Sequence, residues 1–239
     1  MKCLYYTLTV LLSLFLSVPN TSERKAQAYV DSHRTAWYGL WGGMGICPEI
    51  AEAVVYPEIL RYSTLQDIVE STLNYSTYVT TGSTGFNFSV GRFQIKPSFV
   101  EQLEAAWMQS GLDSQFHYRF DTGDTRQARR QRIRRMQKEK WQPVYLGMFL
   151  RMLYWSYGGL DGLSFEEQVQ LIANAYNRGC PWPKAGTGDL DILRHRIADK
   201  TFHFTLGSGR MAEHYAYPEL ALDWFHEVMP GPWPCVSLN

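Results

Sequence analysis

The segment 141–157 constrains the fold of this 239-residue chain more than any other, because it is apolar on almost every face. A helix over this segment would carry two adjacent apolar stripes. One stripe holds Tyr145, Met148, Phe149 and Met152, and the next holds Leu146, Leu150 and Leu153. A helix that is hydrophobic all round is buried. The segment therefore predicts a central core helix that other elements surround.

Apolar residues also recur at helical spacing elsewhere in the chain. They predict a first core helix over 45–56, a second over 65–73 and a third near 219–228. Pro57 should end or kink the first of these, because proline lacks the backbone N–H that the helix ladder needs. These helices supply the elements that would cover segment 141–157.

Two capping boxes mark further helix starts. Ser98 with Glu101, and Ser164 with Glu167, have the spacing at which a hydroxyl and a carboxylate satisfy each other's backbone N–H groups. The stretch 80–95 is rich in Gly, Thr, Ser and Phe, which indicates a loop with a short extended piece. The expected fold is therefore mainly α, in a single domain with one short extended segment.

Charge is balanced overall and concentrated locally. Lys plus Arg and Asp plus Glu each number 23, so no global field points to nucleic acid or to a membrane. The segment 126–140 holds eight basic residues and one glutamate. Such runs are usually exposed helix faces, which is the favoured interpretation here; the alternative is contact with an anionic polymer or lipid.

The N-terminus has the pattern of a secretory signal. Lys2 precedes an apolar run from Leu4 to Val18, which is shorter than a membrane span needs. The sequence 26–28, Ala-Gln-Ala, suits cleavage at residue 28, although cleavage near 17–20 is the alternative. The chain is thus expected to be exported to the periplasm or cell envelope, with residues 1–28 removed and 29–239 forming the domain.

Three cysteines follow the signal, and they allow one disulfide and one free thiol. They are Cys47, Cys180 and Cys235. Pro-flanked segments around Cys180 and Cys235 slightly favour that pairing, and no cysteine has metal-ligand spacing. A cysteine peptidase that pairs Cys47 or Cys180 with His195 or His214 is a minor alternative.

Two short motifs carry the strongest functional signal. Segment 89–98 reads Ser-Val-Gly-Arg-Phe-Gln-Ile-Lys-Pro-Ser, and segment 175–179 reads Ala-Tyr-Asn-Arg-Gly. In this order, the pair resembles the signature motifs of lytic transglycosylases and goose-type lysozymes, over roughly residues 47–183. Without the resemblance, the motifs would be an ordinary Gly turn before a helix and an ordinary helix C-terminus. The resemblance implies a lysozyme-like domain with a glycan groove beside the extended segment.

The resemblance also implies site residues and a substrate. Gly91, Phe93 and Gln94 would contact sugar through backbone, ring face and amide, and Asn177 would line the same groove. Tyr176 would hydrogen-bond the catalytic carboxyl. The partner would be a peptidoglycan glycan strand, with no cofactor and no metal. For Phe93, burial in the core is the simpler alternative.

Two glutamates compete for the catalytic role that the family assigns to a helix upstream of the Gly-Gln motif. Glu58 lies four residues after Val54 and eight after Ile50, so it extends a buried stripe if the helix passes Pro57. Burial would raise its pKa, as a general acid near neutral pH requires. Glu70 is followed by serine, as in the family, but lies on a polar row. We favour Glu58 and keep Glu70 as the alternative.

The implied reaction needs only one protein carboxylate. Glu58 would protonate the bond between N-acetylmuramic acid and N-acetylglucosamine, and then deprotonate the muramic 6-hydroxyl to give a 1,6-anhydro end; lysozymes use water instead. Asp67 and Asp161 could serve as second carboxylates but are more simply surface residues. Departures from the family pattern at Ile59, Phe93 and Arg178 support one alternative. This is a non-catalytic envelope protein that binds glycan or a protein partner.

Overall fold

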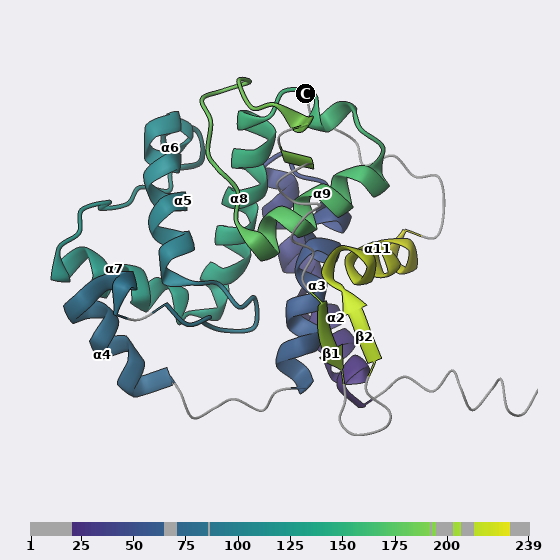
Figure 1. Cartoon of the computed structure of the whole chain (residues 1–239), viewed down its shortest axis with the longest axis horizontal. Helices are drawn as coiled ribbons and strands as arrows, with labels where there is room; N and C mark the ends of the chain where they lie inside the picture. The colour runs from purple at the N-terminus through teal and green to yellow at the C-terminus, as the bar shows by residue number, and fades with distance from the viewer. Residues whose placement is uncertain are drawn as a thin grey trace, which may run out of the picture.

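The computed structural model describes residues 21–64, 71–85, 87–191, 193–194, 203–206 and 213–229, and these are mainly helical (Figure 1). The helices are α2 (Thr21–Gly43), α3 (Pro48–Thr64), α4 (Ser71–Thr81), α5 (Pro97–Ser110), α6 (Leu112–Phe116), α7 (Arg126–Met136), α8 (Gln142–Ser156), α9 (Phe165–Arg178) and α11 (Tyr217–Val228). Short 3-10 turns are η1 (Gly82–Thr84), η2 (Glu139–Trp141) and η3 (Leu160–Gly162). Strands β1 (His203–Leu206) and β2 (Glu213–Ala216) pair antiparallel, with His203 opposite Ala216.

Helix α8 lies at the centre of the fold, which confirms the expectation from its all-round apolar sequence. Its side chains are buried along nearly the whole helix, and α2, α3, α5 and α9 all contact it. The indole Nε1 of Trp41 donates a hydrogen bond to the carbonyl oxygen of Pro143 at 2.9 Å, which ties α2 to the start of α8. Among the described residues, no helix is both long and apolar enough to cross a membrane.

Helix α3 is the second buried helix, and it does not end at Pro57. The helix continues to Thr64, and every residue from 51 to 60 is buried. The missing proline donor is tolerated because α2, α9 and α11 pack around the helix. Tyr217 of α11 donates a hydrogen bond to the carbonyl oxygen of Val54 at 3.0 Å. Glu58 therefore keeps its place on the buried stripe.

Helix α2 spans the expected boundary at residue 28, which stays a prediction. The helix is continuous from Thr21 to Gly43, and Ala26 is fully buried in the core. Cleavage at residue 28 would remove the first two turns of this helix together with Ala26. Cleavage in the alternative region, 17–20, would leave α2 whole.

One of the two expected capping boxes forms. Ser164 and Glu167 satisfy each other's backbone groups at the start of α9. Helix α5 instead begins at Pro97, with Lys96 as its N-cap, so Ser98 lies inside the first turn. The backbone N–H of Ser98 donates to Oδ1 of Asn87 at 2.9 Å. A side chain from the preceding loop therefore replaces the expected box.

The region between the first two core helices differs from expectation. The predicted helix 65–73 falls mostly outside the described residues, as does Glu70. Helix α4 extends into the stretch that was expected to be a loop, and η1 follows it. In place of the expected extended piece in 80–95, there is an isolated β-bridge between Val90 and Ile95. This bridge closes a tight turn over 91–94.

The basic segment 126–140 is an exposed face only in part. Helix α7 directs Arg129 and Arg132 inward, and both are buried. Arg132 Nε donates to Glu104 Oε2 at 2.8 Å, and Arg135 Nη2 donates to Glu104 Oε1 at 2.7 Å. The hydroxyl of Tyr145 donates to the same Oε1 at 2.7 Å. This buried network joins α5, α7 and α8.

The cysteines also correct an expectation. Cys180 is a free thiol, whereas Cys47 is disulfide-bonded. The slightly favoured pairing of Cys180 with Cys235 is therefore wrong. Rigid Pro-flanked surroundings do not determine which sulfur atoms can approach each other.

Candidate active site

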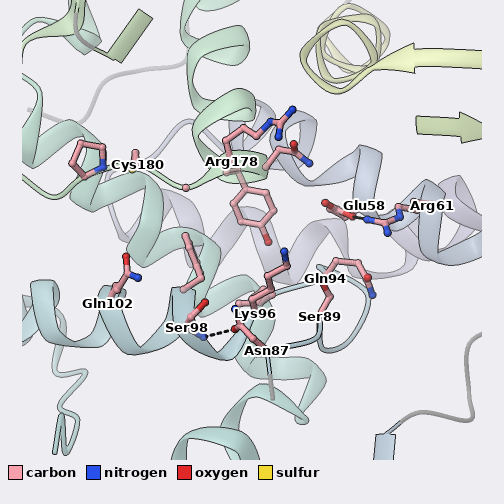
Figure 2. Close-up of a pocket in the computed structure, with 16 residues that line it drawn as sticks. Glu58, Arg61, Asn87, Ser89, Gln94, Lys96, Ser98, Gln102, Arg178 and Cys180 are labelled. Carbon is pink, nitrogen blue, oxygen red and sulfur yellow. Dashed lines mark hydrogen bonds and ion pairs between the residues drawn. The ribbon is translucent and has the colours of Figure 1, made fainter. Parts of the chain in front are cut away.

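A cavity of about 810 Å³ lies where α3, the segment 87–98, α5 and the end of α9 meet (Figure 2). Its lining residues come from both predicted motifs, from α3 and α5, and from positions that flank the motifs. They are Glu58, Arg61, Asn87, Ser89, Gln94, Ile95, Lys96, Ser98, Phe99, Gln102, Tyr176, Asn177, Arg178, Gly179, Cys180 and Pro181. The predicted residues Glu58, Gln94, Tyr176 and Asn177 are thus brought together, although they lie up to 119 positions apart in the sequence.

Glu58 lies at one end of this cavity and is 6% exposed. Burial raises the pKa of its carboxyl to about 7, against the opposing effects of Arg61, Lys96 and Asn177. Arg61, one helical turn further along α3, places Nη1 3.6 Å from Glu58 Oε2. The carboxyl is thus set to exchange a proton near neutral pH.

Glu58 differs from the two other buried glutamates in its hydrogen bonding. Glu52 accepts two bonds from Arg34, both at 2.9 Å, and one from Trp224 Nε1 at 3.0 Å. Glu104 accepts three bonds from the network of α7 and α8. In contrast, buried Oε2 of Glu58 accepts no hydrogen bond from a described residue, and its ion pair with Arg61 is long, at 3.6 Å. Such a group is costly to bury, which points to a role other than stability.

The turn 91–94 forms part of the cavity wall, and its first residue must be glycine. Gly91 has φ +70°, and a Cβ there would clash with the side chain of Gln142. Gln142 Oε1 accepts a hydrogen bond from the backbone N–H of Phe93 at 3.0 Å. Gln94 also has a positive φ of 51°, and its Nε2 donates to the carbonyl oxygen of Gly91 at 2.8 Å. Gly91 therefore shapes the turn and does not itself line the cavity.

Tyr176 lines the cavity, but its hydroxyl does not bond the carboxyl of Glu58 as expected. The hydroxyl donates to the carbonyl oxygen of Phe93 at 2.8 Å. Burial raises the pKa of Tyr176, and the charge of Glu58 raises it further, so the two groups are close neighbours. Tyr176 therefore fixes the turn 91–94 next to Glu58.

Phe93 does not present its ring to the cavity. It is fully buried, and its ring packs edge-on against Trp37, with the ring centroids 5.2 Å apart. The expected sugar stacking on Phe93 is therefore wrong. An apolar ring is more stable in the core than in contact with water.

Of the alternative carboxylates, Asp161 is described, and it is not part of the cavity lining. Asp161 lies in η3 and is exposed, away from the lining residues. Asp67 and Glu70 lie outside the described residues. Glu58 is thus the single carboxylate among the described residues that line the cavity.

Sequence reasoning did not identify the three cations of the cavity as a group. They are Arg61, Lys96 and Arg178. Arg61 follows Glu58 by three residues, which places it on the same helix face, and this spacing was the available signal. Lys96 and Arg178 stood inside the two motifs without an assigned role.

Other chemistries have weaker support in this site. Burial raises the pKa of the Cys180 thiol to about 12, so little nucleophilic thiolate forms there near neutral pH. The described residues contain no group of three or more His, Cys, Asp or Glu side chains positioned to hold a metal ion. Comparisons of the chain with protein-family models, curated proteins and solved structures gave no match.

Proposed function

We propose that this chain is a glycan-cleaving enzyme with Glu58 as general acid and base, acting on peptidoglycan as a lytic transglycosylase with a lysozyme-like domain. One observation carries the proposal. Among the described residues, Glu58 is the single carboxylate lining the cavity; its pKa is about 7, and one of its buried oxygen atoms has no hydrogen-bond partner there. This combination is typical of a catalytic acid and unusual for a structural glutamate.

The first step would be proton transfer from Glu58 to the glycosidic oxygen of the bond that follows N-acetylmuramic acid. The C1–O bond breaks, its electron pair stays on the leaving oxygen, and positive charge develops at C1 of the muramic ring. With a pKa of about 7, roughly half of the Glu58 carboxyls would be protonated at neutral pH. The resting enzyme can therefore supply this proton.

The second step would use the carboxylate that the first step leaves. Glu58 takes the proton of the muramic 6-hydroxyl, whose oxygen bonds C1 and gives a 1,6-anhydro product. Glycosidases that use water or a protein nucleophile normally need two carboxylates. The described cavity lining offers one, which favours the intramolecular route.

The remaining lining residues would orient the glycan. Gln94 and Asn177 place amides on the cavity, and these can pair with sugar hydroxyl and N-acetyl groups. Tyr176 would act indirectly, because its bond to the carbonyl oxygen of Phe93 fixes the turn that carries Gln94. Export to the periplasm or cell envelope would bring the enzyme to this substrate.

A non-catalytic glycan-binding protein is the second candidate, and one observation favours it. The hydroxyl of Tyr176 bonds Phe93, so it does not hold the Glu58 carboxyl in place. Such a protein would keep the groove and the cations but would release no product.

We expect the purified chain to release muropeptides with 1,6-anhydro ends from peptidoglycan sacculi, as detected by mass spectrometry. Preparations treated with iodoacetamide should release the same products, because the reaction uses no thiol and the buried Cys180 thiol, with a pKa of about 12, reacts slowly. Products with reducing muramic ends would show that the chain acts as a muramidase and not as a lytic transglycosylase. Binding to sacculi without any product would favour the non-catalytic candidate.

A further inference from the structure

The cations of the cavity are a local excess in a chain with no net charge. Arg61, Lys96 and Arg178 line the cavity, and Glu58 is the single carboxylate among its described lining residues. With Glu58 protonated, the lining carries three positive charges and no negative one. A concave site of this kind attracts anionic ligands.

Two of the cations lie at the Glu58 end of the cavity. Arg61 comes from α3 and Lys96 from the residue that caps α5, so two separate elements approach the same carboxyl (Figure 2). Each cation is close enough to lower the pKa of Glu58. The pair therefore brackets the place where the proton is transferred.

Neither Arg61 nor Lys96 has a close ion-pair partner in the described part of the chain. The distance of 3.6 Å from Arg61 Nη1 to Glu58 Oε2 is longer than a hydrogen bond, and within the described part of the chain Arg61 has no other ion pair. Lys96 is exposed and forms no ion pair with any described residue. By contrast, Arg34 and Arg132 elsewhere in the fold bind glutamates at 2.8 to 2.9 Å. Donors of Arg61 and Lys96 are thus available to a ligand.

We propose that Arg61 and Lys96 form a binding site for a substrate carboxylate beside the bond that Glu58 protonates. A guanidinium binds a carboxylate through two parallel hydrogen bonds, and a nearby ammonium adds a point charge. The inference rests on the proposed function for the identity of the glycan. It selects muramic strands that carry a carboxylate and disfavours neutral polymers of N-acetylglucosamine.

Binding of this carboxylate would also increase the protonated fraction of Glu58. The groups around Glu58 are Arg61, Lys96, Asn177, Tyr176 and Tyr217, of which the two cations and Asn177 lower its pKa. A bound anion neutralises both cations, so the pKa of Glu58 rises and its protonated fraction increases. The substrate would thus favour the protonated form of the acid that cleaves it.

The carboxylate has two chemical sources in peptidoglycan. In strands without stem peptides it is the lactyl carboxylate of the muramic residue. In peptide-substituted strands the lactyl group is an amide, and the carboxylates belong to the peptide. Both present the same group to Arg61 and Lys96.

The test measures equilibrium binding of fluorescent tetrasaccharides to the full chain in a Glu58→Gln background, which mimics the protonated acid and prevents cleavage. The ligands are a muramic tetrasaccharide with free lactyl carboxylates, the same molecule with lactyl amides, a peptide-substituted form and a neutral N-acetylglucosamine tetramer. We expect the free carboxylate to bind about tenfold more tightly than the amide. Stronger binding of the peptide-substituted form would identify the peptide as the source.

Variants then test whether Arg61 and Lys96 cause the preference for the carboxylate over the amide. Arg61→Gln and Lys96→Gln should each reduce the preference for the carboxylate, and Arg61→Lys should retain part of it. Arg130→Gln and Lys138→Gln remove one exposed charge outside the cavity and should leave it unchanged. Equal binding of carboxylate and amide, or equal loss in the control variants, would overturn the inference.

The outcomes separate this inference from the proposed function. A carboxylate preference that depends on Arg61, in a protein whose wild type releases no product, supports the binding site and contradicts the enzyme. Anhydro products from wild type without a carboxylate preference would support the enzyme and contradict the binding site.

Discussion

Replacing Glu104 by glutamine should lower the free energy of unfolding by about 3–5 kcal/mol, because the change leaves a buried arginine without its counter-charge. Glu104 is fully buried, and Arg132, which bonds it at 2.8 Å, is 2% exposed. The nearest other carboxylate is that of Glu101, 3.7 Å from Arg132 Nη1 and partly exposed. Glutamine keeps the shape of the side chain but cannot offer a full negative charge. The network therefore loses its central charge.

Urea denaturation of wild type and Glu104→Gln, followed by circular dichroism, measures this loss. The matched control is Glu166→Gln, which removes an exposed carboxylate whose Oε1 lies 3.8 Å from His226 Nε2. The control should change stability by less than about 1 kcal/mol. A loss in Glu104→Gln no larger than in the control would show that the network does not hold α5 and α7 together.

Glu58 should make the protein less stable as pH rises, and Glu58→Gln should remove this effect. Burial raises the pKa of Glu58 from 4.5 to about 7, so the folded state favours the protonated form. Its contribution to stability is complete below pH 4.5 and is lost as pH rises through 7. The rise in pKa from 4.5 to about 7 corresponds to a loss of about 3 kcal/mol in the free energy of unfolding. At pH 8, Glu58→Gln should therefore be more stable than wild type by up to that amount.

The comparison needs denaturation curves for both proteins at pH 5 and pH 8. Other groups titrate over this range, so the quantity of interest is the difference between wild type and variant at each pH. That difference should be larger at pH 8 than at pH 5. Asp161→Asn, at an exposed site, should show no such change. A difference that does not depend on pH would mean that the pKa of Glu58 is not raised.

The sequence was sufficient to predict the core helices, because their evidence is periodic and local. The all-round apolar pattern of 141–157 predicted the burial of α8, and the stripe through Ile50 and Val54 predicted the burial of Glu58. The capping box at Ser164 formed for the same reason, since all its partners lie within one helical turn. Local patterns of this kind hold when tertiary packing agrees with them.

Expectations that depended on distant partners were less accurate. Packing by neighbouring helices carries α3 through Pro57, whose local effect alone would end it. Arg132 is buried because Glu104, 28 positions earlier, provides a counter-charge that composition cannot indicate. Tyr176 bonds the carbonyl oxygen of Phe93 rather than a carboxyl, which depends on an arrangement 83 positions apart in the chain. Motifs indicated which residues meet, but not which atoms bond.

The measurement that tests the role of Glu58 most directly is the rate of anhydromuropeptide release from sacculi by wild type, Glu58→Gln and Glu70→Gln. The assay uses equal amounts of protein whose folding has been checked by circular dichroism, with Glu166→Gln as the exposed control. We expect Glu58→Gln to lose about 100- to 10,000-fold in rate, the usual contribution of a general acid and base, while Glu70→Gln and the control keep the wild-type rate. Retained activity in Glu58→Gln together with loss in Glu70→Gln would contradict the account.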